Sequence, residues 1–175
     1  VNWDWRGLSM SPDITFEIMA AYPDKDWNYA LASINPNLKL EYVLQYPEKK
    51  WNWSDISRNS AITIDIIEKY PKNPWSWLAI SQNPNVTEEI IEKYNKKPWN
   101  WRVLSNNKNL SFDFFKKILD DPTKELDMSW LSENPVITFD IVQDNPTLRW
   151  DWSALSKNPS ITSEIVLNNL DKPWS

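Results

Sequence analysis

One 24-residue pattern recurs along almost the whole chain, and it limits the possible folds more than any other feature. It is clearest where WNWSDISRNSAITIDIIEKYPKNP, residues 51–74, is followed directly by WSWLAISQNPNVTEEIIEKYNKKP, residues 75–98. Counted from the first tryptophan of each copy, the repeats cover 3–26, 27–50, 51–74, 75–98, 99–125, 126–149 and 150–173, with a three-residue insertion in the fifth, and 174–175 open an eighth. Tandem periods of this length are typical of architectures in which neighbouring units complete one another's core.

Each repeat predicts two short helices. Position 2 always holds a favoured N-cap residue: Asp4, Asn28, Asn52, Ser76, Asn100, Asp127 and Asp151. A first helix of at most two turns, partly 3₁₀, should start there and end before the Asn-Pro at positions 9 and 10. A second helix of about eight residues should start at position 13, which holds Thr15, Lys39, Thr63, Thr87, Ser111, Thr138 and Thr162. An acidic residue two positions later faces the positive end of that helix dipole in every repeat.

Helices of this length are marginal in water when isolated, so they need neighbours. We therefore predict an all-α fold, a right- or left-handed α-solenoid of seven 24-residue two-helix repeats forming a single domain, 1–175. The single glycine argues against a hairpin-rich β fold. Because the sequence lacks an initial methionine and stops inside a repeat, we expect it to be part of a longer array.

The pattern W-x-W-x-x-L-S-x-N-P-x-I-T-x-E-I-I resembles Trp-rich tandem repeats of giant DNA viruses of the mimivirus type. The clearest stretches are LSENPVIT at 131–138 and LSKNPSIT at 155–162, and the resemblance covers all seven repeats. The period and the Asn-Pro turn are also similar to leucine-rich-variant repeats, which form superhelices of alternating α and 3₁₀ helices, although the Trp pair departs from that pattern. The resemblance implies a location in the host cytoplasm or the virion, and it carries no catalytic residue to this chain.

The thirteen tryptophans are interpreted as core spacers between helices, because a buried indole fills a large volume and needs one partner for its N–H. The predicted repeat core contains Trp3, Trp5, Trp27, Trp51, Trp53, Trp75, Trp77, Trp99, Trp101, Trp150 and Trp152. Trp130, at position 5, and Trp174 are the expected exposed exceptions. The alternative is a platform on which sugars or single-stranded nucleic acid stack.

The constant polar columns favour structure over chemistry. Position 7 is serine in all seven repeats and position 9 is asparagine in six, with Ser11 in the first. The chain has no histidine to activate a serine and no cysteine, so we expect no enzymatic activity, no metal site and no cofactor. We interpret the serines as hydrogen-bonding contacts between repeats and the asparagines as an internal polar ladder. The acidic column is explained by helix capping alone.

Function is expected at the positions that vary. Positions 4 and 8 carry arginines and large apolar residues, which are common at interface centres, and Trp130 joins them. The candidate partner-binding residues are Arg6, Met10, Ile34, Arg58, Leu78, Gln82, Arg102 and Trp130. The first hypothesis is a non-enzymatic scaffold for protein–protein interaction. The alternatives are a self-assembling component of a fibre, sheath or virion-associated layer, and a carbohydrate-binding Trp platform.

The partner is accordingly a protein or a second copy of this chain. A net charge of −5 argues against nucleic acid, and no apolar run is long enough to span a membrane. Within the array, Leu126 and Met128 replace the Trp pair of the sixth repeat directly after the insertion, so we predict a bend or a looser stack there.

Overall fold

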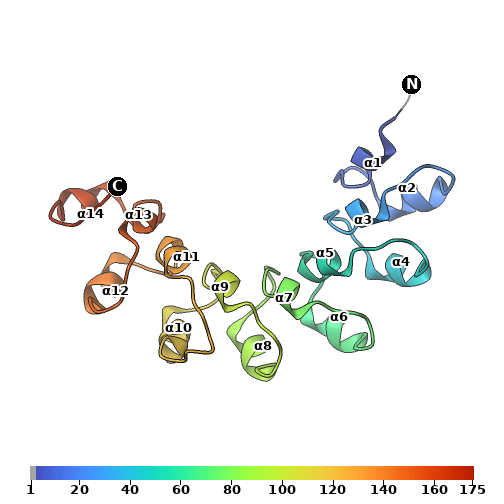
Figure 1. Cartoon of the computed structure of the whole chain (residues 1–175). Coiled ribbons are helices and arrows are strands. Elements are labelled where there is room, and N and C mark those ends of the chain that lie inside the picture. Colours follow the sequence, from blue (N-terminus) through green and yellow to red (C-terminus); the bar gives the residue numbers. More distant parts are fainter. Residues whose placement is uncertain (1–2) are drawn as a thin grey trace. The chain divides into compact units, whose positions relative to one another are not determined.

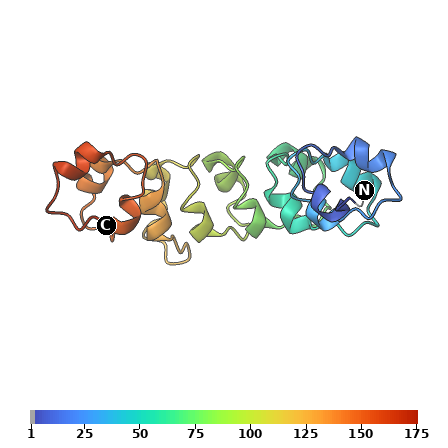
Figure 2. The same ribbon diagram turned by 90° about the horizontal axis from the view of Figure 1, so that it is seen from above.

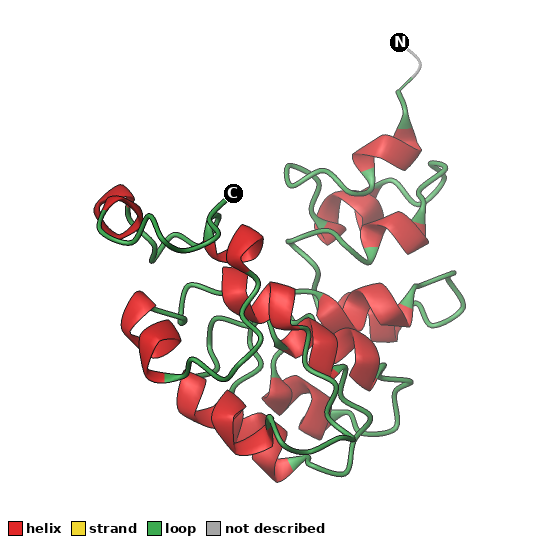
Figure 3. Ribbon diagram, turned by 60° about the vertical axis from the view of Figure 1, so that its left-hand side comes forward, coloured by secondary structure: helices red, strands yellow, loops and turns green. Residues whose placement is uncertain are grey.

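The computed structural model describes residues 3–175, and all regular secondary structure in that range is helical (Figures 1 and 3). Fourteen short helices and no strand are found among these residues, which confirms the all-α prediction. The helices follow one another at a regular spacing that is compatible with a solenoid.

The helices alternate between two kinds. The first helix of each repeat is α1 (Trp5–Leu8), α3 (Tyr29–Ala32), α5 (Trp53–Arg58), α7 (Trp77–Ile80), α9 (Trp101–Leu104), α11 (Met128–Glu133) and α13 (Trp152–Leu155). The second helix is α2 (Phe16–Ala21), α4 (Leu40–Gln45), α6 (Ile64–Lys69), α8 (Glu88–Lys93), α10 (Phe112–Ile118), α12 (Phe139–Asp144) and α14 (Ser163–Leu167).

The chain divides into two compact parts, an N-terminal part of residues 1–85 and a C-terminal part of residues 86–175. The boundary falls inside the fourth repeat, between α7 and α8. Within each part taken by itself, the first helices lie along one side and the second helices along the other (Figure 1). Viewed from above, the helix pairs of each part succeed one another in chain order (Figure 2).

The predicted caps are confirmed at all seven first helices and at four of the seven second helices. In all seven repeats the residue at position 2 precedes the first helix, and its side chain accepts a hydrogen bond from a backbone N–H of the first turn. Position 13 precedes the second helix in all seven repeats as well. The side chains of Lys39, Thr63 and Thr87 make no cap bond there.

The helices differ in detail from the sequence prediction. The second helices contain five to seven residues instead of about eight. The first helices are α-helical, and their 3₁₀ character is limited to the exit, where Ser9 N–H donates to Arg6 O at 3.2 Å as well as to Trp5 O at 3.1 Å. Both differences arise because residues that could be helical by local propensity belong to turns instead. These turns are the Asn-Pro turn after the first helix and the loop that follows the second helix.

The core is built mainly from position 6 of the first helix, joined by Ala79 in α7 and Ala154 in α13, and from several positions around the second helix. The buried residues at position 6 are Ala32, Ile56, Ile80, Leu104, Leu131 and Leu155, and those at position 17 are Met19, Val43, Ile67, Ile91, Phe115 and Val142. Position 12, just before the second helix, adds Leu38, Ile62, Val86, Leu110 and Ile137. Position 14 also belongs to the core where it holds Phe16, Leu40, Phe112 and Phe139, which the sequence analysis did not predict.

Candidate functional site

Within each of the two parts, the serine column joins a repeat to the next. The Ser57 hydroxyl donates to Trp53 O at 2.7 Å and accepts the backbone N–H of Ser76, at position 2 of the following repeat, at 3.0 Å. The same N–H to hydroxyl bond, at 2.9–3.0 Å, joins Asn28 to Ser9, Asn52 to Ser33, Asp127 to Ser105, Asp151 to Ser132 and Ser175 to Ser156. The predicted inter-repeat role of the serines is confirmed, and their hydroxyls are occupied by backbone groups.

The asparagine column forms a second ladder. Asn83 Nδ2 donates to the carbonyls of Ser57, Asn59 and Ile62 at 2.9–3.0 Å, and its Oδ1 accepts the Asn85 N–H at 2.9 Å. Asn35 and Asn158 reach three carbonyls of the preceding repeat in the same way, and Asn59 and Asn134 reach two. These five side chains are buried, so the ladder satisfies backbone groups that water cannot reach.

The tryptophans at position 1 form hydrogen bonds to the end of the preceding second helix. Each Nε1–H donates to the carbonyl five residues earlier, at 2.7–3.0 Å, in Trp27, Trp51, Trp75, Trp99, Trp150 and Trp174. Their rings meet the position-3 ring of the preceding repeat edge to face, with centroids 4.9–5.2 Å apart in Trp5–Trp27, Tyr29–Trp51, Trp53–Trp75 and Trp152–Trp174. The W-x-W motif therefore supplies both halves of a ring pair that spans two repeats.

A lysine near the end of the repeat covers several position-3 rings. Lys25 lies over Trp5 with its ammonium 5.5 Å from the ring centroid, and Lys124 lies over Trp101 at 5.2 Å. Lys49 takes the same place over Tyr29, at 5.2 Å. Cation–π attraction of this kind adds to the stability of these ring positions.

Burial corrects two of the predictions for individual tryptophans. Trp3, predicted as core, is 60% exposed, because the described residues contain no preceding helix whose carbonyl could take its N–H. Trp174, expected to be exposed, is half-buried against Trp152 and Phe139. Trp130 is 43% exposed, as predicted. The remaining predicted core tryptophans are buried or half-buried.

The candidate partner-binding residues are all exposed. In the described range every side chain at positions 4 and 8 is exposed, which sets these two columns apart from the serine and asparagine columns. The apolar members are Met10 (45% exposed), Ile34 (40%) and Leu78 (55%). Arg6, Met10, Ile34, Arg58, Leu78 and Gln82 belong to the N-terminal part, whereas Arg102 and Trp130 belong to the C-terminal part.

Some of these residues are brought together. Ile34 and Arg58 line one hollow of the N-terminal part, together with Asp55 and two prolines. Arg58 pairs with Asp55 one turn earlier in α5, and its Nη1 donates to Gln82 Oε1 at 3.2 Å in the next repeat. In the C-terminal part, Arg102 lies 3.4 Å from Asp127. The arginines are therefore positioned by neighbours while their side chains stay exposed.

Two carboxyl groups at contacts between repeats have lowered pKa values. Lys39 donates to Glu17 across two repeats, and this bond lowers the pKa of Glu17 from 4.5 to about 2. Ser129 Oγ donates to Asp151 at 2.6 Å and lowers the pKa of that carboxyl group. Burial raises the pKa of Tyr42 well above its ordinary value of 10.0. Each shift has a structural cause in the stack, and none singles out an acid–base pair.

The insertion in the fifth repeat leaves the ladder intact. α10 is the longest of the second helices at seven residues, and its C-cap Leu119 stays in the right-handed helical region. The Asp127 N–H still reaches Ser105 Oγ at 2.9 Å, and Asn134 Nδ2 still reaches Ser105 O at 3.0 Å. These two bonds are as short as in other repeats. The bend or looser stack at the sixth repeat stays a prediction.

The C-terminal part has a hollow that was not predicted from the sequence. Its apolar lining is Leu110, Phe112, Val136 and Ile141, and its polar lining is Glu88, Lys108, Asn109, Ser111 and Asp113. The available signal was Val136, because position 11 otherwise holds Asp13, Asn37, Ala61, Asn85, Asn109 and Ser160. Val136 has no polar group, so it cannot form the contact with the preceding repeat that Asn37, Asn85 and Ser160 form.

The fold and its ladders define a Trp-rich, repeating, all-helical protein. Among residues 3–175 no group of three or more acidic side chains is placed to hold a metal ion, and no helix has the length and apolar character needed to cross a membrane. Comparison with protein-family models, curated proteins and solved structures gives no match. The resemblance to repeats of giant DNA viruses stays a prediction.

Proposed function

We propose that this chain is a non-enzymatic α-solenoid of seven stacked 24-residue repeats that presents the side chains of positions 4 and 8 to a protein partner. The observation that carries the proposal is that constant and variable positions of the repeat have different environments. The constant serine, asparagine and tryptophan columns are used for contacts between repeats, whereas the variable columns 4 and 8 are exposed. Variation at exposed positions of a constant framework is how repeat proteins form binding surfaces.

Stacking is supported by bonds that recur with the period of the sequence. The hydroxyl bond, the amide bonds and the edge-to-face ring pair each link one repeat to its immediate neighbour. Because none of the helices exceeds seven residues, their stability must come from these neighbour contacts. A non-enzymatic role is supported by the use of the serine hydroxyls in backbone bonds and by the lack of any histidine or cysteine in the sequence.

The composition of columns 4 and 8 suits a protein partner. Met10, Ile34 and Leu78 offer apolar surface, and Arg6 and Arg58 offer cationic donors beside it. Exposed apolar side chains flanked by arginine are typical of the central residues of protein interfaces. A nucleic-acid partner is disfavoured by the net charge of −5.

Self-assembly remains the alternative proposal. Leu167 and Leu170 of the seventh repeat are 68% and 70% exposed, and contact with another repeat would cover apolar surface of this kind. A carbohydrate platform has less support, because the rings at positions 1 and 3 pack against each other and only Trp3 and Trp130 stand out as exposed tryptophans in the described residues.

Photo-crosslinking from two exposed positions tests the proposal. A photoreactive phenylalanine analogue replaces Leu78 in column 4 or, as the matched control, Lys116 on the exposed face of α10. In extract of cells that naturally contain the protein, we expect an adduct with another protein from position 78 only. Excess unlabelled wild-type protein should prevent formation of this adduct by competition. Excess unlabelled Ile34→Ser/Leu78→Ser variant should leave the adduct yield unchanged.

Each other outcome has a defined meaning. Adducts between two copies of this chain would favour self-assembly. Equal labelling from positions 78 and 116, or none from either, would contradict a binding role for columns 4 and 8. Circular dichroism of both labelled proteins checks that the replacements leave the helices unchanged.

A further inference from the structure

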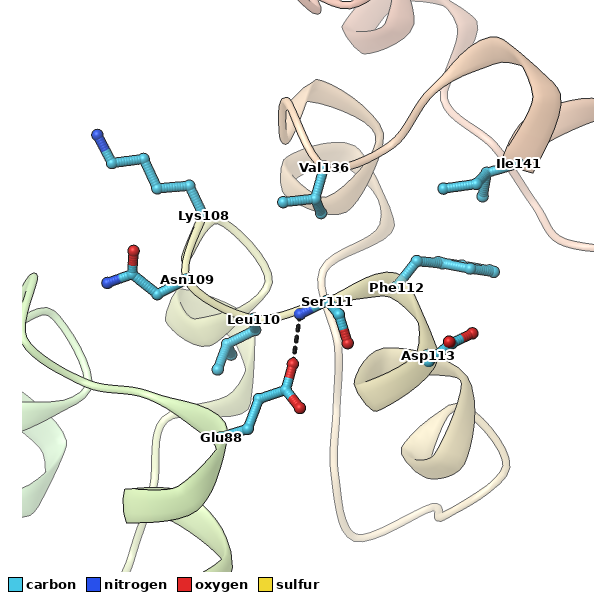
Figure 4. A pocket seen from close by; sticks show the side chains of 9 residues that line it. All are labelled: Glu88, Lys108, Asn109, Leu110, Ser111, Phe112, Asp113, Val136 and Ile141. Carbon is cyan, nitrogen blue, oxygen red and sulfur yellow. Dashed lines mark hydrogen bonds between the residues drawn. The ribbon is translucent and has the colours of Figure 1, made fainter.

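The hollow in the C-terminal part lies beside the start of α10, between the fifth and sixth repeats (Figure 4). Figure 4 shows Phe112, Val136 and Ile141 around one side of the hollow and Glu88 on the other. Val136 and Ile141 are half-buried, so part of their apolar surface is accessible, whereas Leu110 and Phe112 are buried beneath them. None of these residues belongs to columns 4 and 8, which makes this site independent of the proposed partner surface.

The hollow coincides with a missing bridge between repeats. At position 11 of the second, fourth and seventh repeats a polar side chain donates to a backbone carbonyl of the preceding repeat. Asn85 Nδ2 donates to Ser60 O at 2.8 Å, Asn37 Nδ2 donates to Pro12 O, and Ser160 Oγ donates to Pro135 O at 2.6 Å. Val136 has no donor to reach back in this way. The junction therefore keeps an apolar gap where a side-chain amide would otherwise span it.

The charges at the rim are mainly negative. Glu88 accepts the Ser111 backbone N–H at 2.6 Å, which holds its carboxylate at the hollow, and Asp113 lies in the first turn of α10. Figure 4 shows the Lys108 side chain directed away from the hollow. Glu89 and Asp140 add exposed carboxylates next to Glu88 and Ile141 in the sequence. An apolar gap with the Glu88 and Asp113 carboxylates at its rim is complementary to an apolar side chain flanked by cations.

We propose that this hollow binds an aliphatic side chain from a basic segment of a partner protein. The aliphatic group would contact Val136 and Ile141, and flanking lysines or arginines would face Glu88 and Asp113. The remaining lone pairs of the Glu88 carboxylate are available for such a contact, because the Ser111 N–H uses only Oε1.

Methyl NMR with two defined peptides tests this site. The probes are blocked Lys-Leu-Lys and Glu-Leu-Glu tripeptides, and the protein carries ¹³C-labelled Val and Ile methyl groups. We expect saturable shifts of the Val136 and Ile141 methyl signals with Lys-Leu-Lys, while the buried Val142 signal stays in place. Glu-Leu-Glu should bind at least about fivefold more weakly, because each rim charge contributes a modest, screened attraction.

Three variants isolate the two features of the site. Val136→Asn introduces the amide found at positions 37 and 85, and it should bridge to the preceding repeat, fill the gap and abolish the Ile141 shift. Ala61→Asn makes the same kind of substitution at position 11 of the third repeat and should leave the affinity unchanged. Glu88→Gln keeps an oxygen acceptor for the Ser111 N–H but removes the charge, so it should weaken Lys-Leu-Lys binding roughly two- to fivefold.

The proposal is overturned if Lys-Leu-Lys gives no saturable shift, if the acidic peptide binds equally well, or if Val136→Asn retains full affinity with an unchanged thermal midpoint. If Val136→Asn lowers the thermal midpoint, the affinity of the Glu88→Gln variant for Lys-Leu-Lys is compared with that of the wild type. An unchanged affinity in Glu88→Gln overturns the proposal as well.

Discussion

At the scale of single residues, the asparagine at position 9 links the repeats more extensively than any other side chain. Asn83 contributes one amide group that donates to three carbonyls and accepts one N–H, all within a buried junction. No other side chain of this size combines two N–H donors with a carbonyl acceptor. An apolar replacement would remove the hydrogen bond that each of these carbonyls accepts from Asn83, and a carboxylate would repel the carbonyl oxygens.

Replacing Asn83 should therefore lower the free energy of unfolding, and the isosteric change to aspartate should lower it more than truncation to alanine. We expect Asn83→Ala to lower the free energy of unfolding by about 3–5 kcal/mol, because four hydrogen bonds of a buried side chain are lost together. Asn83→Asp should lower it further, since a carboxylate would face three carbonyl oxygens. Urea denaturation followed by circular dichroism measures both changes.

The matched control is Asn106→Ala, because Asn106 is exposed at position 8. Its effect should stay within about 0.5 kcal/mol. Equal losses at positions 83 and 106 would show that the buried ladder does not stabilise the fold.

A second residue-scale prediction concerns Asn73, whose Nδ2 is buried without a hydrogen-bond partner. It occupies position 23, where Lys25 and Lys49 cover the rings of Trp5 and Tyr29. Asn73→Lys should place an ammonium over Trp53, the equivalent ring, and raise the free energy of unfolding by about 1 kcal/mol. Asn73→Met removes the amide without adding a charge. If both variants have the same stability in urea denaturation, the cation–π explanation is wrong.

At the scale of helices, capping hydrogen bonds supply stability that the short helices lack. A helix of four to seven residues leaves most of its backbone N–H and carbonyl groups without intrahelical partners, so each capping bond satisfies a large share of them. Caps and acidic first turns recur in every repeat because the helices cannot be stabilised by length.

The two kinds of position-13 residue allow a test of this account. Ser111 Oγ accepts the Phe114 N–H at 3.2 Å, whereas Thr63 makes no cap bond although it stands at the same place before α6. Ser111→Ala should lower the free energy of unfolding by about 1 kcal/mol, and Thr63→Ala by less than about 0.5 kcal/mol. Thermal unfolding followed by circular dichroism compares the two variants, and equal losses would contradict a specific role for the cap bond.

Local features of this kind were predictable from the sequence, and contacts between repeats were only partly so. The caps at Asp4 or Thr138 follow from residue type and spacing, and a small polar contact could be assigned to the serines because they recur at every repeat. The partners of the Trp27 and Trp51 indoles could not be assigned, since their N–H groups bond to carbonyls that carry no residue-specific signal. The hollow at Val136 depends on the absence of a side-chain hydrogen bond from that one residue to the preceding repeat. A periodic sequence pattern does not predict the absence of a single contact.

At the scale of the whole molecule, the bonds that link repeats depend on relative position and little on the identity of the repeat. The hydroxyl bond spans 19 residues at Ser57 and Ser132, and it spans 22 where the insertion intervenes. The added residues are absorbed by the loop after α10 while the ladder keeps its geometry. A stack of this kind should accept a further complete repeat at a junction.

Duplicating residues 51–74 directly after Pro74 tests that expectation. The inserted copy carries its own Trp51, Ser57 and Asn59 equivalents, so every inter-repeat bond can form on both of its sides. We expect unchanged mean residue ellipticity and a free energy of unfolding that rises by about 1–4 kcal/mol, as for added residues of average stability. Circular dichroism with urea denaturation measures both quantities.

The control is a duplication of residues 57–68, which adds half a repeat and places first-helix residues where second-helix residues belong. Its serine and asparagine would meet no matching N–H or carbonyl, so the variant should lose stability in the same urea measurement. If the complete and the half duplication were equally destabilising, the repeats would not be exchangeable units and the solenoid proposal would fail. If both were tolerated, the hydrogen-bonded ladders would not determine the register of the stack, and packing of the apolar residues at positions 6 and 17 would have to do so instead.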